Sequence, residues 1–510
     1  MGGPLLALLA TAAHLGCVDA PARAQAPATP AAVAPAVKRP PNIVLISMDG
    51  LRWDRTHLGG NPRATTPSLD ALAKEGATFV NSLSTSNESL FSHAAMFTGR
   101  YPSELGTPDY LEFLMPQDAT TLAEALGAVG YDTAAFTSGG HIKGTFGFAQ
   151  GFSRYFEGQD FGSFRDTVPE ASAWIAERSG ERPWFVFLHG YDCHRPYLHE
   201  SVFWHPFHDG GADRIDELLL QRNFSESIYK GVYYPKYRHA WAMHANGERI
   251  LDPELYREIP DYAAKAAPDE RDPLSQAEQD HILAHYDGAV LEADTYVGMF
   301  LDALAARPGG LSDTLVIVTS DHGEDLATHG YYNHRAITFD STTRVPMVLA
   351  GAIPASARGA TRTELVDALD VVATAMDAAG SVPPAGSHGV SLLGVLAGTA
   401  PAKDVVYQHG VMGQLSARTA RWRLVFEGGD LREADAMARL MESPLAAPTW
   451  TLFDVAADPG EQVDVLAAHP DEAKALRAGM VQWWARLPRG TASQALSPET
   501  EAMLRRNGYW

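Results

Sequence analysis

The 510-residue sequence contains only two cysteines, Cys17 and Cys193. A disulfide framework of the kind that stabilises small secreted domains needs several cysteine pairs. If Cys17 is lipidated or removed with a leader, Cys193 has no partner at all. The fold must therefore be held by its hydrophobic core, for which the sequence has enough length and 45% hydrophobic residues.

Positive charge is also scarce. Lys and Arg number 40 against 62 Asp and Glu, which gives a formal net charge of −22. Nucleic acids and other polyanions bind basic surfaces, so this composition excludes them as bulk partners. A small anionic substrate stays compatible with the sequence if a metal ion or an arginine concentrates positive charge locally.

The N-terminus has no Lys or Arg ahead of its apolar run, Pro4 to Ala13, which is too short to span a bilayer. The run is typical of an export signal, and the following HLGC resembles a lipoprotein cleavage box ending at Cys17, with His14 where an aliphatic residue is expected. Ordinary cleavage after Ala24-Gln25-Ala26 and a disordered Ala-rich tail are the alternatives. We expect residues 1–39 to be a signal segment and an Ala/Pro tether, and the protein to be exported, either periplasmic or lipid-anchored to the bacterial envelope.

Short apolar runs alternate with helical patterns from residue 40 onward. This alternation predicts an α/β fold with a mostly parallel central sheet flanked by helices. The strands are expected at 42–48, 131–138, 183–190, 314–323 and 345–351, and the helices at 68–76, 120–130 and 289–304.

Two regions depart from this rhythm. Residues 200–275 are rich in His, Tyr, Trp and charge without a clear period, which predicts an insertion near the mouth of the site or a surface excursion without a chemical role. After residue 397 the pattern changes to strands at 418–429 and 450–462 and a helix from about Pro470. We expect a catalytic domain over 40–397 and a small C-terminal α+β subdomain over 398–510.

Polar residues follow several predicted strands at the points where these strands end. Asp49 follows the first strand, Asp192 and His194 follow the strand that ends at residue 190, and Asp321, His322 and Glu324 follow TLVIVTS. Ligands of parallel α/β sheets lie outside the carboxyl ends of the strands. A single aspartate there often only caps the next helix. Carboxylates and imidazoles from several strands of one sheet instead predict a site for a divalent cation.

The stretch SLFSHAAMFTGR begins with Ser89, which is expected to open a helix. A hydroxyl nucleophile needs its proton removed and its alkoxide stabilised, and a metal ion together with a helix N-terminus supplies both. The alternative is that Ser89 is a plain N-cap, and Ser92 is an equally good candidate for either role.

Six motifs in this order resemble the sulfatase family of the alkaline phosphatase superfamily, over roughly residues 41–397. They are SMDGLRWDR, TTPSLDALAKEGATFVNS, SLFSHAAMFTGRYPSELGT, FLHGYDCHRPY, SDHGEDLATHG and RVPMVLAG, and LFDVAADPGEQVDVL resembles the C-terminal subdomain of that family. The resemblance implies an alkaline phosphatase/sulfatase-like fold. It also implies that one divalent metal is bound by Asp49, Asp321, His322 and the hydroxyl of the nucleophile Ser89.

Three histidines complete the site that the resemblance implies. His93 stands at the position of the arginine in the family motif C/S-x-P-S-R-x-x-x-x-T-G-R, near the nucleophile. His194 matches the histidine that contacts the transferred group or the leaving oxygen. His334 falls near the lysine or histidine that binds the substrate anion in relatives.

The nucleophile motif also departs from the family. Phe91 and His93 replace the Pro and Arg that the enzymes converting Cys or Ser to formylglycine read, so Ser89 resembles the T-x-P-S-H-A-S branch with an unmodified hydroxyl. Met48 replaces the first of two consecutive aspartates, and His322 stands where many members have Asn. A serine sulfate cannot eliminate to an aldehyde, whereas a phosphoserine is readily hydrolysed. Phosphate or phosphonate esters are therefore favoured over sulfate esters.

The predicted function is the metal-dependent hydrolysis of a small anionic ester, in some cases glycan-linked, by Ser89. His194 is expected to protonate the leaving alkoxide, and His93 and His334 to orient the anion. The alternatives are a formylglycine-dependent sulfatase acting on carbohydrate or aryl sulfates and a catalytically silent sulfatase-like binding protein. Ca, Mn and Mg suit the oxygen-rich site, imidazole favours Mn or Zn, and a second metal using Asp192 or His334 stays open.

Overall fold

The computed structural model describes residues 39–487 with gaps. The gaps are at 107–112, 179, 196, 198–200, 205, 208–241, 244–248, 251–275, 330–333, 335–337, 411–412, 428–439 and 446–448. The chain divides into two compact units, Met1–Arg39 and Pro40–Trp510. The predictions for the N-terminal segment and for most of the 200–275 insertion concern residues outside the described part of the chain. Within the described part of the chain, no helix has both the length and the apolar character needed to cross a bilayer.

The centre of the larger unit is an eight-stranded sheet with the order β10-β2-β9-β8-β1-β5-β3-β4. All neighbouring strands are parallel except β9, which runs antiparallel to β2 and β8. The strands are β1 (Asn42–Met48), β2 (Ala77–Leu83), β3 (Asp132–Thr137), β4 (Arg154–Glu157), β5 (Trp184–Gly190), β8 (Thr314–Thr319), β9 (Met347–Gly351) and β10 (Ala360–Asp367). The prediction of a mostly parallel sheet is confirmed.

The register of the three middle strands aligns their carboxyl ends. Ser47 of β1 lies opposite His189 of β5 and Thr319 of β8. All seven residues of β1 are buried, because neighbouring strands flank it and helices cover both faces of the sheet. The residues that directly follow these three strands are therefore brought to one edge of the sheet.

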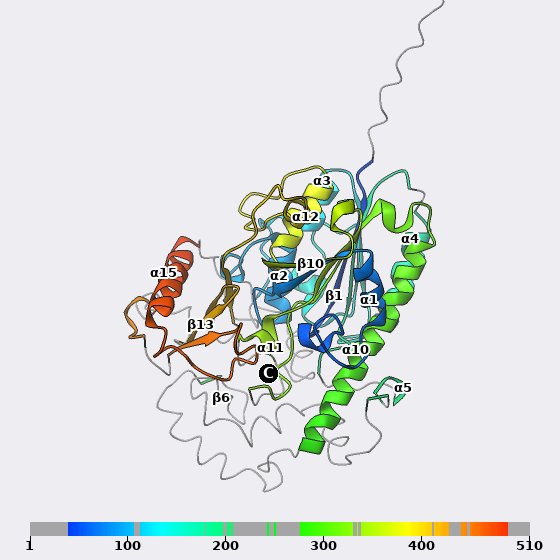
Figure 1. Cartoon of the computed structure of the whole chain (residues 1–510). Helices are drawn as coiled ribbons and strands as arrows, with labels where there is room; N and C mark the ends of the chain where they lie inside the picture. Colours follow the sequence, from blue (N-terminus) through cyan, green and yellow to red (C-terminus); the bar gives the residue numbers. More distant parts are fainter. Residues whose placement is uncertain are drawn as a thin grey trace, which may run out of the picture. The chain divides into compact units, whose positions relative to one another are not determined.

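Helices cover both faces of the sheet (Figure 1). On one face, α1 (Pro67–Lys74), α4 (Phe164–Ala176) and α10 (Gln276–Ala305) share a hydrophobic cluster with alternate strand residues such as Val44 and Ile46. On the other face, α2 (Ser89–Thr98), α3 (Leu122–Ala128), α12 (Asp370–Ala378) and α13 (Leu392–Ala397) pack on Ile43 and Leu45. The helix predicted at 289–304 is the second half of the longer α10.

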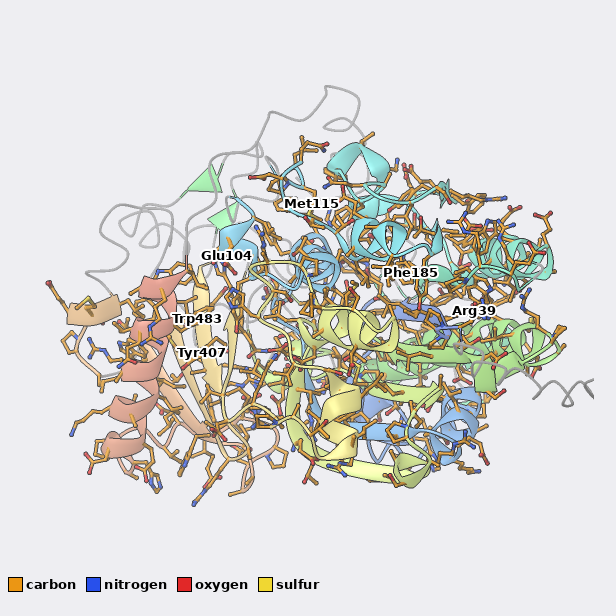
Figure 2. All side chains as sticks on the ribbon, turned by 90° about the horizontal axis from the view of Figure 1, so that it is seen from above. Arg39, Glu104, Met115, Phe185, Tyr407 and Trp483 are labelled. Atoms are coloured by element: carbon orange, nitrogen blue, oxygen red, sulfur yellow. The ribbon has the colours of Figure 1, made fainter. Side chains whose placement is uncertain are left out.

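A second, antiparallel sheet with the order β11-β12-β13-β14 follows α13. Its strands are β11 (Val406–His409), β12 (Gln414–Arg418), β13 (Trp422–Glu427) and β14 (Trp450–Asp454), and α15 (Pro470–Arg486) packs on it. Tyr407 and Trp483 are labelled at this contact in Figure 2. Their rings stack with centroids 4.8 Å apart. The predicted C-terminal strands and helix are present, whereas the boundary between 397 and 398 stays a prediction because Pro40–Trp510 forms one compact unit.

The described residues also include short elements that position loops. These are the helices α5 (Ser201–Trp204) and α11 (Asp340–Thr343), the hairpin strands β6 (Ala242–Met243) and β7 (Arg249–Ile250), and the 3-10 turns Trp53–Arg55, Pro102–Glu104, Gly140–Ile142, Gly144–Phe146, Gly310–Asp313 and Ala355–Ala357.

Candidate active site

Three predicted metal ligands meet at the carboxyl edge of the sheet. Asp49 directly follows β1, and Asp321 and His322 follow β8. The backbone N–H of Asp49 donates to the carbonyl of Gly190 at 3.1 Å, and the N–H of Gly50 donates to Asp321 Oδ1 at 3.2 Å. These bonds join the ends of neighbouring strands and hold both carboxylates in place.

The three side chains are fully buried and their ligand atoms lie close together. His322 Nε2 is 3.4 Å from Asp321 Oδ2 and 3.8 Å from Asp49 Oδ1. Ligand atoms about 2.1 Å from one ion lie about 3.0 Å apart at right angles and about 3.4 Å apart at the tetrahedral angle. Neither Asp49 Oδ1 nor Asp321 Oδ2 has a hydrogen-bond partner among the described residues. Two orphaned carboxylate oxygens and an imidazole nitrogen at these separations fit a divalent cation.

The tautomer of His322 supports the same fit. Its Nδ1–H donates to the carbonyl of Gly323 at 2.9 Å. The lone pair of Nε2 therefore faces Asp49 and Asp321, which is the arrangement of a metal-ligating histidine whose other nitrogen is fixed by a backbone carbonyl.

Asp49 and Asp321 are close together and buried, and each carboxylate affects the pKa of the other. Burial, and then the charge of Asp321, raise the pKa of Asp49 well above its ordinary value. Burial alone would also raise the pKa of Asp321, but the nearby imidazoles of His322 and His93 lower it instead. The pair therefore retains a proton in the absence of a cation, and a bound cation would replace that proton.

Ser89 is the first residue of α2, and Glu88 occupies the N-cap position without a side-chain capping bond. The reading of Ser89 as a plain N-cap is therefore wrong. The Ser89 hydroxyl donates to His322 Nε2 at 3.0 Å, inside the carboxylate cluster. Ser92 is committed elsewhere, because its hydroxyl donates to the carbonyl of Asp321 at 2.6 Å.

His93 lies one turn after Ser89, and both of its ring nitrogens already have partners. Nδ1–H donates to the carbonyl of Ser89 at 2.8 Å, and Nε2 accepts from the hydroxyl of Ser47 at 3.0 Å. Burial lowers the pKa of His93, so the ring is neutral at pH 7. His93 thus contacts the backbone of the nucleophile through one ring nitrogen and the Ser47 side chain through the other.

His189 is a member of the site that sequence reasoning missed. It is the penultimate residue of β5, it is fully buried, and its Nε2 lies 3.2 Å from Asp49 Oδ2. Burial lowers its pKa well below the ordinary value, so the neutral ring donates this hydrogen bond. The available signal was a polar residue inside an apolar strand next to the predicted Asp192 and His194.

His194 and His334 also reach the site, together with Glu324. The ring centroids of His334 and His322 are 4.0 Å apart and stacked, and those of His194 and His334 are 5.1 Å apart. His334 Nδ1 lies 3.0 Å from Glu324 Oε1. Burial lowers the pKa of His194 well below its ordinary value and raises that of Glu324.

Two further results concern acidic residues. Glu88, which the sequence analysis did not single out, is fully buried with an oxygen 2.9 Å from His141 Nδ1 and another 3.8 Å from His334 Nε2. Asp192 accepts the backbone N–H of Phe164 at 2.9 Å, at the start of α4. Asp192 therefore holds α4 and belongs to no ligand group among the described residues.

Comparisons with known proteins agree with this architecture. Residues 41–381 match the family model described as sulfatase. An arylsulfatase of Clostridium perfringens is 24% identical over 389 residues, which is 69% of this chain and 77% of that protein.

Two solved structures share the fold. One is a complex with D-glucosamine-2-N,6-O-disulfate, with a TM-score of 0.66 and 20% identity over 88% of this chain and 98% of that chain. The other is the phosphonate monoester hydrolase of Agrobacterium radiobacter, with a TM-score of 0.63 and 19% identity over 88% of this chain and 96% of that chain.

Proposed function

The chain belongs to the sulfatase family of ester hydrolases, and from this membership and its site geometry we propose that Ser89 is the unmodified nucleophile of a metal-dependent hydrolase. The observation that carries the proposal is the hydrogen bond of 3.0 Å from the Ser89 hydroxyl to His322 Nε2, within reach of Asp49 and Asp321. A structural serine in a buried helix would not need two carboxylates beside it, each with one oxygen that has no hydrogen-bond partner among the described residues.

The metal is proposed to be held by Asp49, Asp321, His322 and the Ser89 oxygen. A divalent cation bound there would supply Lewis-acid polarisation of a non-bridging ester oxygen and would lower the pKa of the Ser89 hydroxyl. The protein itself fixes the nucleophile, because Ser89 opens α2 and its hydroxyl is aimed by His322. The partial positive charge of the α2 N-terminus favours the alkoxide that forms.

The surrounding histidines divide into two groups. His93 and His189 hold Ser89 and Asp49 through the contacts at 2.8 and 3.2 Å, so we assign them positioning roles. His194 and His334 are proposed to serve the substrate anion and the leaving oxygen. The lowered pKa of His194 makes it a poor proton donor in the free protein, which argues against the acid role that its sequence position suggests.

We propose that the substrates are small anionic phosphate or phosphonate esters, including esters linked to a glycan. Ser89 is followed by Phe91 and His93 instead of Pro and Arg, so formylglycine formation is disfavoured. A phosphoserine can be hydrolysed at such a centre, whereas a serine sulfate is a stable ester. The fold shared with a phosphonate monoester hydrolase is consistent with this choice.

The rival is a formylglycine-dependent sulfatase, which the arylsulfatase relative motivates. Mass spectrometry of the peptide that contains Ser89 separates the two, because formylglycine is two hydrogens lighter than serine. Turnover of nitrophenyl phosphate, a phosphodiester, a phosphonate and a sulfate should then be compared in the wild type and in Ser89→Ala. An unmodified serine with turnover of phosphorus esters supports the proposal, and formylglycine with turnover of the sulfate alone refutes it.

We further propose that the protein is exported and anchored by a lipid on Cys17, from the apolar run and cleavage box near the N-terminus. Labelling of expressing cells with a radioactive fatty acid should mark the wild type and not Cys17→Ser. An unlabelled, periplasmic wild type would leave ordinary export, and a cytoplasmic protein would contradict both.

A further inference from the structure

The segment that leads to the nucleophile is buried and irregular. It runs from Ser84, directly after β2, to Glu88 at the N-cap of α2, and all of its side chains are buried. The backbone of such a segment belongs to no helix or sheet ladder, so its buried N–H and carbonyl groups need hydrogen-bond partners from other parts of the chain. Those partners decide where Ser89 begins α2.

The C-terminal sheet supplies two of these partners through its edge strand β11. Gln408 Nε2 donates to the carbonyl of Ser84 at 2.9 Å, and the backbone N–H of His409 donates to the carbonyl of Thr85 at 2.9 Å. A small hydrophobic cluster also joins β11 to β2 and β10. The C-terminal sheet is therefore bonded directly to the backbone that precedes the nucleophile.

Arg423 of β13 sets the orientation of the Gln408 amide. Arg423 Nη1 donates to Gln408 Oε1 at 2.5 Å, and the hydroxyl of Ser416 donates to the same oxygen at 2.6 Å. A guanidinium group has donors and no acceptor, so the amide oxygen must face Arg423. The amide N–H groups are thereby turned towards the carbonyl of Ser84.

The other main-chain group of Ser84 is bound within the same network. Its N–H donates to the carbonyl of Thr343, at the end of α11, at 2.7 Å. Arg423 pairs with Asp340 at the start of α11 and donates to the carbonyl of Thr338 just before it. Both backbone groups of Ser84 are therefore fixed by elements that one buried guanidinium holds together.

We infer that Gln408 is a positioning residue for Ser89, which makes the C-terminal sheet a part of the catalytic unit. The inference rests on the proposed function, because it assigns Gln408 to the nucleophile of that reaction. Without the amide donor, the buried carbonyl of Ser84 loses its bond to β11, and the segment would shift to satisfy it. The Ser89 hydroxyl would then leave its place 3.0 Å from His322 Nε2. A misplacement of about 1 Å costs about 10²-fold in rate.

The test compares two variants of Gln408 in the full chain. Gln408→Met keeps the length of the side chain without the amide, and Gln408→Glu keeps acceptor oxygens for Arg423 and Ser416 without the N–H donor. We expect each to lower kcat by about 10²-fold on whichever of nitrophenyl phosphate, the phosphodiester and the phosphonate the wild type hydrolyses fastest. KM should stay within about threefold, because the lost interaction concerns the nucleophile and not the bound ester.

Ser416→Ala is the matched control, because it removes a bond to the same amide and leaves the bond from Gln408 Nε2 to Ser84. Its kcat should stay within about threefold of the wild type. Hydrogen–deuterium exchange adds a readout that does not depend on turnover. Peptides that cover residues 84–92 should exchange faster in both Gln408 variants than in the wild type and in Ser416→Ala.

Circular dichroism of each variant establishes that the fold is intact, and if Gln408→Met does not fold, Gln408→Glu carries the test. A folded Gln408 variant with kcat within about threefold of the wild type would overturn the inference. An equal loss of kcat in Ser416→Ala would overturn it as well, because the effect would then not depend on the bond to Ser84.

The outcome is distinguishable from the fate of the proposed function. If the wild type hydrolyses phosphorus esters and the Gln408 variants match it in kcat and in exchange, the inference is refuted and the proposed function stands. If the wild type hydrolyses no ester of the set, the proposed function is refuted. Faster exchange of residues 84–92 in the Gln408 variants would then still support the hold of Gln408 on this segment, and unchanged exchange would refute it.

Discussion

Two of the buried carboxylate pairs among the described residues treat their charge in opposite ways. At the junction of the two sheets, Arg423 forms ion pairs with Asp340 and with Glu461, the latter at 2.6 Å, and Arg418 lies 3.1 Å from Asp340. Beside Ser89, the side chains of Asp49 and Asp321 are fully buried with histidines around them.

The difference shows in the acid strengths of the two aspartates. The guanidinium groups of Arg418 and Arg423 outweigh burial and lower the pKa of Asp340. At Asp49 burial and the charge of Asp321 act together, and the pKa rises well above its ordinary value. A buried carboxylate pair is stable when the protein supplies cations, as Arg418 and Arg423 do. Where the protein supplies imidazoles and no guanidinium group, a metal ion would supply the missing positive charge.

The largest expected effect concerns the nucleophile. Ser89→Ala should lower kcat by about 10⁵-fold, because removal of a covalent nucleophile takes away the main reaction path. The ion should bind more weakly than in the wild type, because the Ser89 oxygen is lost as a ligand, but Asp49, Asp321 and His322 remain and should retain it at saturating ion. Steady-state kinetics and metal analysis check this, and turnover within tenfold of the wild type would remove Ser89 from the mechanism.

The second effect separates the two carboxylate pairs. Asp321→Asn should reduce turnover by about 10⁴-fold, or about 5.5 kcal/mol of barrier, and should lose the ion beside Ser89. Asp340→Asn is the matched control, because the same change at the arginine-rich pair should lower stability and leave the ion content unchanged. Equal ion contents in the two variants would contradict the comparison.

The third prediction concerns the guanidinium group of Arg423, which is the cation that the protein itself supplies to Asp340 and Glu461. Arg423→Met should destabilise the fold by about 3–5 kcal/mol, because Glu461 and part of Asp340 are left as buried charges without their partner. Chemical denaturation measures the change. Ion binding at Asp49 and Asp321 should be unaffected, and a loss below about 1 kcal/mol would show that the junction tolerates uncompensated charge.

The smallest effect is the response to a chelator. At an ion concentration of about 100 times Kd, binding to the native state adds about 2.7 kcal/mol of stability, and a chelator should remove it. Differential scanning calorimetry should therefore record a lower Tm in the wild type and in Arg423→Met. The Tm of Asp321→Asn should respond less, and an equal response in all three would place the stabilising ion elsewhere.

The strands and helices were largely predictable because their patterns are local. The run NIVLISM forms β1 over its full length, and the helix predicted at 68–76 is α1 with its ends moved by one or two residues. The antiparallel direction of β9 was not predictable, since direction depends on how the chain returns to the sheet. The start of α10 at Gln276 lies thirteen residues before the predicted start and directly after the stretch without a clear period.

The types of the site residues were predictable from the sequence, but the contacts between them were less so. Asp49, Asp321 and His322 could be named from strand ends and from a family resemblance. His189 and Glu88 could not, because a buried histidine in a strand and a glutamate before a helix are usually structural. Whether Ser89 or Ser92 faces the cluster depends on the rotation of α2 against the sheet, which is set by the packing of all its residues.

By itself, the sequence determined the α/β class, the buried strands and the kinds of side chain at the strand ends, because hydrophobic periodicity and chain order are local properties. Tertiary structure alone decided which acidic residues meet a guanidinium and which meet a second carboxylate. That outcome depends on strand register and helix packing, which bring residues such as Asp49 and Asp321 together from 272 positions apart in the chain, within the reach of one ion.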